Sequence, residues 1–169
     1  IYHNPACGTS RNTLAMIRAA GIEPTVIDYL KTPPSPDEIR TIAKAAGGTL
    51  RDLIREKGTP YAELGLADPK WTDENLLGFI ALHPILLNRP IVVTDKGAAL
   101  CRPSENVLAL LPEGAVKTFT KEDGEVVRLL AVVPAGRERR RDGLVDVDED
   151  GRRAGRKIVV EEHHAGIEI

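Results

Sequence analysis

Residues 3–12 read HNPACGTSRN and place one thiol, Cys7, between an expected N-terminal strand and the helix that follows. A thiol at a helix N-terminus lies close to unpaired backbone N–H groups and to the positive end of the helix dipole. Both favour the thiolate, so we expect the pKa of Cys7 to lie below that of a free cysteine. The same N–H groups can bind a tetrahedral oxyanion. This loop therefore predicts both a nucleophile and an anion-binding site.

Ser10 stands three residues after Cys7, where a dithiol oxidoreductase would carry its second cysteine. A local disulfide is therefore excluded. The Ser10 hydroxyl can instead donate a hydrogen bond to the Cys7 thiolate or to a bound oxyanion. In the structural alternative, Cys7 is a buried apolar residue and Ser10 is the N-cap of a helix running from about Arg11 to Ala20.

Two further motifs accompany this loop: LNRPIVV over residues 87–93 and LCRPSE over residues 100–105. Together with residues 3–12, they resemble the glutaredoxin-coupled arsenate reductases of the thioredoxin superfamily, the ArsC family. The resemblance extends from Ile1 to about Val127. It also includes LIREK at residues 53–57, which contains Arg55, and YAELGL at residues 61–66.

The resemblance implies an active site in which Cys7 attacks arsenate and three arginines, Arg55, Arg89 and Arg102, hold the oxyanion. Guanidinium groups stay charged and offer forked donors that pair with two oxygens at once, which suits this role. The start of the helix completes the expected substrate-binding site with Gly8, Thr9, Ser10 and Arg11. In the alternative interpretation, each arginine is a solvated surface charge.

His3 and Pro90 are also assigned roles by the resemblance. As an imidazolium, His3 would lower the pKa of the thiol, and in the family the histidine at this position is associated with activation of the cysteine. A structural role is the alternative. Arg89-Pro90 is expected to be a cis bond opposite the cysteine, although the sequence rules alone favour trans. The side-chain amide of Asn4 is expected to brace the loop through its backbone.

The resemblance implies two external reductants, glutathione as co-substrate and glutaredoxin as partner. It implies no metal and no tightly bound cofactor. Cys101 is the other cysteine, and we expect it to be buried and inert. The alternative is an internal resolving thiol, which would make an external reductant unnecessary. With two cysteines and no recognisable secretory signal, a cytoplasmic location is the default expectation.

The composition is that of an ordinary globular enzyme, with 42% hydrophobic and 28% charged residues. No apolar stretch approaches the roughly 18 residues needed to cross a membrane. The net charge of −2 gives no basic field of the kind that nucleic-acid binding requires. We therefore expect a monomer that associates with neither membrane nor nucleic acid.

The pattern of strands and helices predicts an α/β protein: a thioredoxin-like mixed sheet flanked by helices, with a helical insertion and a C-terminal extension. The first strand is expected to begin before residue 1, and a second strand spans residues 25–30. Expected helices cover residues 36–46, a segment from Thr49 or Leu50 that carries Arg55, and residues 73–82. A hairpin turn follows at residues 95–97, and Ser104 is expected to cap a last helix over residues 105–111.

The character of the chain changes after Pro112, because five of the six aromatic residues precede it. We expect residues 1–112 to form the enzyme core and residues 113–169 to form an extension. Strands over residues 126–133 and 158–160 would make that extension a small β-rich appendage; a partly disordered segment is the alternative. The arginines of residues 137–141 are expected to lie in a solvated loop, and His163-His164 is a poor chelating pair.

Two other functions stay open at this point. Thiol-bearing regulators that bind RNA polymerase form a related branch of the superfamily, but they usually carry Cys-x-x-Cys and need not keep three oxyanion-binding arginines. A related reductase that acts on another oxyanion is the second alternative, because phosphate has nearly the same charge and shape as arsenate.

Overall fold

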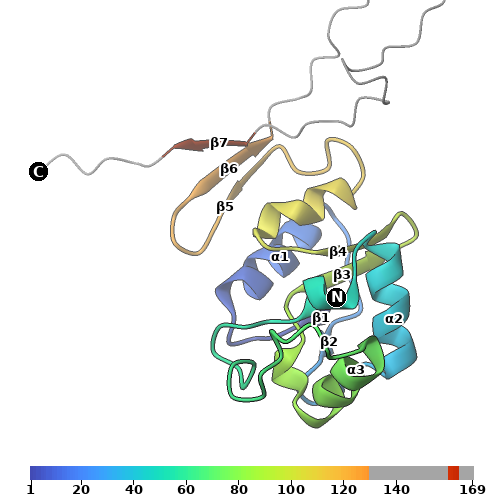
Figure 1. Ribbon diagram of the computed structural model, residues 1–169. Helices are drawn as coiled ribbons and strands as arrows, with labels where there is room; N and C mark the ends of the chain where they lie inside the picture. Colours follow the sequence, from blue (N-terminus) through green and yellow to red (C-terminus); the bar gives the residue numbers. More distant parts are fainter. Residues whose placement is uncertain (130–159, 164–169) are drawn as a thin grey trace, which may run out of the picture. The chain divides into compact units, whose positions relative to one another are not determined.

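A computed structural model describes residues 1–129 and 160–163 (Figure 1). The chain divides into two units, Ile1–Ala115 and a second unit that begins at Val116. The first unit contains the residues of the expected active site and a four-stranded sheet. In the described residues, no helix is long and apolar enough to span a membrane.

The sheet of the first unit is mixed. Its strands are β1 (Tyr2–His3), β2 (Ile27–Asp28), β3 (Ile91–Thr94) and β4 (Gly97–Leu100), arranged in the order β2-β1-β3-β4. β1 runs parallel to β2 and antiparallel to β3, and β3 pairs with β4 in the predicted hairpin. Gly97 suits the hairpin because its φ is +132° and an added Cβ would lie 3.2 Å from the Ala45 carbonyl oxygen.

Helices cover both faces of this sheet. In Figure 1, α1 (Gly8–Ala19) and the 3₁₀ helix η3 (Ser104–Ala109) lie on one side, and α2 (Pro36–Ala45) and α3 (Asp73–Leu82) lie on the other. The 3₁₀ helices η1 (Leu50–Leu53) and η2 (Pro84–Leu86) complete the insertion between β2 and β3. The predicted mixed sheet flanked by helices, with its helical insertion, is confirmed.

The starts of α2 and α3 agree with the predicted capping signals. Ser35 accepts a hydrogen bond from the Glu38 backbone N–H, and the Glu38 carboxylate accepts one from the Ser35 N–H. Thr72 and Asn75 form the same reciprocal pair at α3. Local sequence is sufficient at both sites because each cap is formed by residues only three positions apart.

Three predicted elements differ from the structure. The second strand is only two residues long because the Asp28 carbonyl accepts hydrogen bonds from the N–H groups of Lys31 and Thr32, which turns the chain. The last helix is a 3₁₀ helix in which Pro103 is the N-cap, so the predicted capping role of Ser104 is wrong. The Ser104 hydroxyl instead donates to the Glu105 carboxylate.

Arg55 is the third difference, because it does not lie on a helix. η1 ends at Leu53, and Ile54 then forms an antiparallel bridge with Leu87. The Arg55 N–H donates to the Leu86 carbonyl at 2.7 Å. Pairing with a distant segment therefore overrides the local helical pattern at this point.

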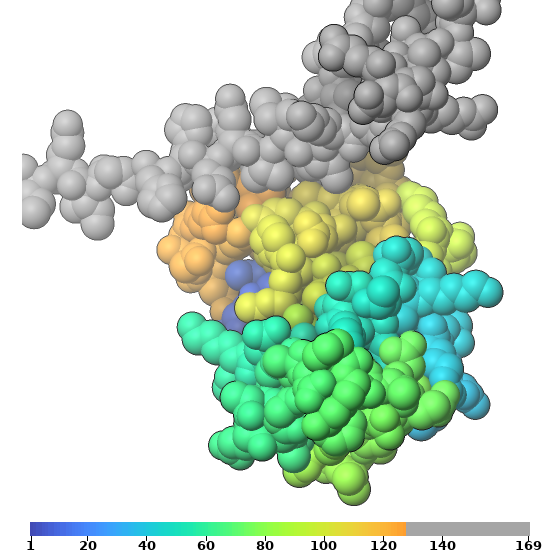
Figure 2. All heavy atoms as spheres, in the orientation of Figure 1, coloured from blue at the N-terminus to red at the C-terminus, as the bar shows by residue number. Residues whose placement is uncertain are grey.

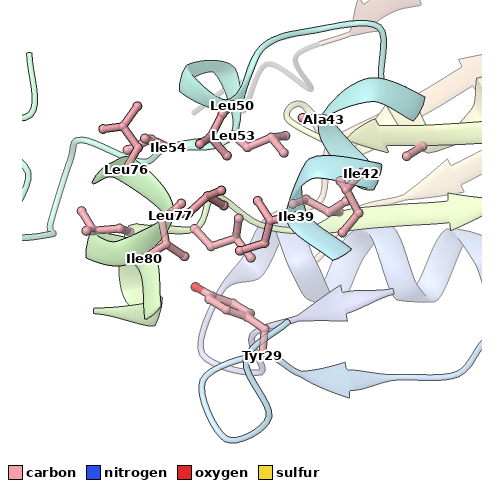
Figure 3. Close-up of a cluster of buried hydrophobic side chains, with 14 of the residues drawn as sticks. Tyr29, Ile39, Ile42, Ala43, Leu50, Leu53, Ile54, Leu76, Leu77 and Ile80 are labelled. Carbon is pink, nitrogen blue, oxygen red and sulfur yellow. The ribbon is translucent and has the colours of Figure 1, made fainter. Parts of the chain in front are cut away.

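The core of the first unit lies between the sheet and the helices α2 and α3 (Figure 3). Ile39 and Ile42 of α2, Leu77 and Ile80 of α3 and the ring of Tyr29 are buried there. Figure 2 shows only a small area of the N-terminal segment (blue) on this face, beside the yellow segment near residue 100.

The second unit contains a separate antiparallel sheet in the order β5-β6-β7. Its strands are β5 (Thr118–Thr120), β6 (Val126–Leu129) and β7 (Val160–His163). The second and third of these correspond approximately to the strands expected around residues 126–133 and 158–160. Residues 130–159, which include the arginine run at 137–141, and His164 lie outside the described residues.

Candidate active site at one end of the sheet

Strand register brings the predicted site residues to one end of the sheet. Tyr2 pairs with Ile27 on one side and with Ile91 on the other, and Ile91 pairs with Leu100. Continued by two residues, this register aligns four positions across the four strands: Tyr29, Asn4, Arg89 and Arg102. Two hydrogen bonds past the strand ends support it, from the Cys101 N–H to the Pro90 carbonyl at 2.9 Å and from Arg102 Nη1 to the Arg89 carbonyl at 3.3 Å.

The loop that carries Cys7 continues from this end of β1 and is held by Asn4. The Asn4 carbonyl accepts from the Cys7 N–H at 3.0 Å, and Asn4 Oδ1 accepts from the Ala6 N–H at 2.9 Å. The predicted bracing by the Asn4 amide is confirmed. Arg11 Nη1 donates to the Pro5 carbonyl at 2.7 Å, which ties the start of α1 back to the loop.

Cys7 itself is the N-cap of α1. Its carbonyl accepts the first intrahelical hydrogen bond, from the Arg11 N–H at 3.0 Å. The helix therefore begins at Gly8 rather than at Arg11, and the alternative that made Ser10 the N-cap is wrong. The first turn contains the N–H groups of Gly8, Thr9 and Ser10, which a helix start leaves without intrahelical partners. These groups lie directly after the thiol, as the sequence predicts.

The surroundings of Cys7 favour the thiolate. Partial burial by itself raises its pKa, but hydrogen bonds from the Ser10 N–H and hydroxyl and from Arg102, together with the charge of Arg89, outweigh that effect. They lower the pKa to about 7 from an ordinary value of 9.0. The contact between Arg102 Nη1 and Cys7 Sγ is 3.8 Å. At neutral pH a large fraction of Cys7 is therefore ionised.

The three predicted arginines come together around this thiol. Arg89 precedes a cis bond to Pro90, as predicted, and the Arg102-Pro103 bond is also cis. Burial, followed by the positive charges of Arg89 and Arg102, lowers the pKa of Arg55, whereas the thiolate of Cys7 raises it. Three mutually repelling cations near one thiolate form a site that an anion stabilises. Arg55 and Arg89 are 34 residues apart in the sequence, and Arg89 and Arg102 are 13 apart. This spacing alone does not predict that the three side chains come together.

Unpaired polar atoms gather in the same place. Among the described residues, the buried side-chain nitrogen and oxygen atoms without a hydrogen-bond partner of ordinary geometry all belong to five residues: His3 Nε2, Ser10 Oγ, Tyr29 OH, Arg55 Nε, and Arg89 Nε and Nη1. Buried polar groups are normally paired, so such a concentration favours a binding site for a polar ligand. The arginine nitrogens among them are hydrogen-bond donors that can serve an oxyanion.

His3 has a different state from the one expected. Its side chain is buried, and burial lowers its pKa, although the Asp28 carboxylate acts in the opposite direction. His3 is therefore mainly neutral at neutral pH, and the imidazolium suggested by the sequence is corrected. The sequence could not show this because the burial arises from the packing of β1 inside the sheet.

Cys101 is buried in the structure, as the preferred interpretation expects. It is fully buried, and burial raises its pKa to about 12. Its Sγ contacts the Ala99 carbonyl oxygen at 3.6 Å, and both cysteines are free. A thiol with this pKa is almost entirely protonated at neutral pH, which disfavours a resolving role.

Tyr29 lies beside the predicted site residues, and the sequence analysis did not identify it. It follows β2 directly, and its register position is next to Asn4. The one signal that could have revealed it is the pairing of β1 with β2, which is set by tertiary structure.

A hollow of about 350 Å³ lies away from these residues. It is lined by α2, η1 and β4 and contains none of the site residues. In the described residues, no group of three or more His, Cys, Asp or Glu side chains is placed to hold a metal ion.

Known proteins share this arrangement of sequence and fold. The chain matches the ArsC family over residues 2–110, which include Cys7 and the three arginines. A protein named arsenate reductase from Rhizobium meliloti (strain 1021) is 65% identical over 127 residues, 75% of this chain and 91% of that protein. Another of that name from Escherichia coli is 61% identical over 127 residues, 75% of this chain and 90% of that protein. The solved structure of arsenate reductase from Vibrio cholerae has a TM-score of 0.63 and 43% identity, and the match covers 65% of this chain and 94% of that one.

Proposed function

The chain belongs to the ArsC family, and we propose that it reduces arsenate to arsenite with Cys7 as the nucleophile. The observation that carries this proposal is the thiol with a pKa of about 7 beside three guanidinium groups. The names of the relatives support arsenate as the substrate. Arg55, Arg89 and Arg102 are proposed to bind its oxygens.

In the first step the Cys7 thiolate attacks arsenic(V). A sulfur–arsenic bond forms, an arsenic–oxygen bond breaks, and the oxygen leaves as water after protonation. The arginines neutralise the charge of the oxyanion and of the leaving oxygen. Arsenic is still pentavalent in this adduct, so the electrons must come from a later step.

Two electrons are needed, and we propose that two external thiols supply them by forming one disulfide. The glutathione thiol displaces a second oxygen from the Cys7-bound arsenic as water. A glutaredoxin thiolate then attacks the glutathione sulfur, a disulfide forms between the two, and the electron pair of the broken sulfur–arsenic bond passes to arsenic. Hydrolysis of the remaining bond releases arsenite and regenerates Cys7.

The cysteine content of the chain supports external thiols. The chain has two cysteines, and Ser10 stands where a second motif cysteine would lie. Cys101 is fully buried with a pKa of about 12. Cys7 is thus the one thiol in the chain suited to attack, and a single thiol cannot provide both electrons by forming an internal disulfide.

The test is arsenate-dependent NADPH oxidation with glutathione, glutathione reductase and glutaredoxin, repeated with the thioredoxin system in their place. We expect turnover with the glutathione system alone, and none from Cys7→Ser, whose circular dichroism should match the wild type. Turnover with thioredoxin alone would contradict the external glutathione step. Turnover in neither system would refute the enzyme activity, and binding to RNA polymerase subunits would then test the regulatory alternative.

A further inference from the structure

Tyr29 lies at the carboxyl end of β2, in register beside Asn4, whose carbonyl and amide hold the Cys7 loop. The side chain is fully buried. Its ring packs in the core cluster with Ile39 and Ile80, and the hydroxyl points to the interior rather than to solvent (Figure 3). The register thus places a buried phenol at the same end of the sheet as the arginines.

The Tyr29 hydroxyl makes no hydrogen bond of ordinary geometry among the described residues. Phenylalanine would fill a core position without this cost, because a buried hydroxyl that makes no hydrogen bond is unfavourable. Besides burial, the groups that influence the pKa of this hydroxyl belong to the anion site. Arg89, the side-chain amide of Asn4 and Arg55 lower it, and Cys7 raises it. Asn4 and then Arg89 occupy the register positions beside Tyr29 at this end of the sheet.

Its protonation state suits a donor. Burial raises the pKa of Tyr29 above its ordinary value of 10.0, and the positive charges of the arginines oppose this effect without reversing it. At neutral pH the hydroxyl is protonated and neutral. It can donate to an anion without adding another positive charge to a site that already contains three guanidinium groups.

We propose that the Tyr29 hydroxyl donates a hydrogen bond to an oxygen of the tetrahedral oxyanion bound at Cys7, and so helps to determine the affinity for that oxyanion. The proposal rests on the proposed function, because it names a further contact to the same substrate. The bound oxygen provides the acceptor that the buried hydroxyl lacks. Tyr29 thereby joins the arginines as a substrate-binding residue.

The test compares wild type with Tyr29→Phe in an assay without any reductant. Iodoacetamide alkylates Cys7, and the arsenate concentration that halves the rate measures occupancy of the site. We expect Tyr29→Phe to raise this concentration about tenfold, the effect of one hydrogen bond to a charged group. The pH midpoint of alkylation without arsenate should stay near that of the wild type, because the phenol is not required to form the thiolate.

Tyr2→Phe is the matched control. It removes a phenol from the neighbouring strand whose pKa is raised by burial and by the charge of Glu38, with no arginine contributing. Both measurements should match the wild type. Equal half-protecting concentrations for wild type and Tyr29→Phe would overturn the proposal. A shift of the alkylation midpoint in Tyr29→Phe would also overturn it, since Tyr29 would then act through the Cys7 loop.

A second measurement covers the case in which Tyr29→Phe does not fold. Wild-type protein labelled with ¹³C at tyrosine Cζ contains three signals, and Tyr2→Phe and Tyr61→Phe assign the one from Tyr29. Arsenate should shift that signal, and an unchanged signal at saturation would refute the contact. Turnover and protection by arsenate are measured separately. If arsenate protects wild-type Cys7 without turnover, only the proposed function is refuted. If the wild type turns over arsenate but Tyr29→Phe is protected as well as the wild type, only this inference is refuted.

Discussion

Replacing Ser10 by alanine tests how the thiolate of Cys7 is stabilised. The hydroxyl is fully buried and has no partner of ordinary geometry among the described residues, yet it and the Ser10 N–H contribute to lowering the pKa of Cys7 from 9.0 to about 7. The net shift is two pH units and reflects four favourable interactions that together outweigh partial burial. We therefore expect loss of the hydroxyl alone to raise the pKa of Cys7 by about half a unit to one unit.

The sign of this change determines the assay. Thiolate is the form that reacts with iodoacetamide, and its fraction falls as the pH drops below the pKa. At pH 6 the alkylation rate of Ser10→Ala should be about three to ten times lower than that of the wild type, whereas at pH 10 the two rates should be nearly equal. A pH series of alkylation rates gives the midpoint directly.

Ser104→Ala provides the control for this substitution. It also removes a buried serine hydroxyl, but that hydroxyl donates to Glu105 on η3 and does not act on the thiol. Its midpoint should remain at about pH 7. An unchanged midpoint in Ser10→Ala would refute the role of the hydroxyl and leave the backbone N–H and the arginines as the groups that stabilise the thiolate.

Three further outcomes are expected. Arg89→Lys should raise the KM for arsenate at least tenfold in the coupled assay, because an ammonium group loses the forked geometry; an unchanged KM would remove Arg89 from the substrate site. Cys101→Ser should keep nearly full activity with glutathione and glutaredoxin, since its thiol is buried with a pKa of about 12, and complete loss in a folded variant would instead indicate a resolving thiol. Ser35→Ala should lower the free energy of unfolding measured in urea by about 1 kcal/mol, because the α2 cap is lost, and should leave the KM for arsenate unchanged. A free energy of unfolding equal to that of the wild type would show that the capping box contributes little.

Sequence alone predicts those parts of the fold that depend on neighbouring residues. The capping boxes at Ser35 and Thr72 mark the starts of α2 and α3 because donor and acceptor are three residues apart. The hairpin at residues 95–97 is predicted for the same reason. The cis bond at Arg89-Pro90 was different, because only the resemblance to a family indicated it.

Features that depend on distant segments escaped prediction. Arg55 lies outside a helix because Ile54 pairs with Leu87, and no local sequence pattern predicts that bridge. The neutral state of His3 follows from its burial in the sheet, which its neighbours in sequence do not reveal. Tyr29 joins the site through the register of β1 and β2. In each case the missing information is which strands become neighbours.

The β3–β4 hairpin carries Arg89 and Arg102 just beyond its two open ends, with four paired positions between them and the turn. The distance between the backbones of Arg89 and Arg102 is therefore set by the strand pairing and not by the length of the turn. Extra residues at Asp95 or Lys96 would leave that distance unchanged. One residue added within β3 would displace Arg89 by about 3.3 Å along the strand and reverse the face of each shifted side chain. The strand pairing of the hairpin thus fixes where the chain positions of Arg89 and Arg102 lie relative to each other.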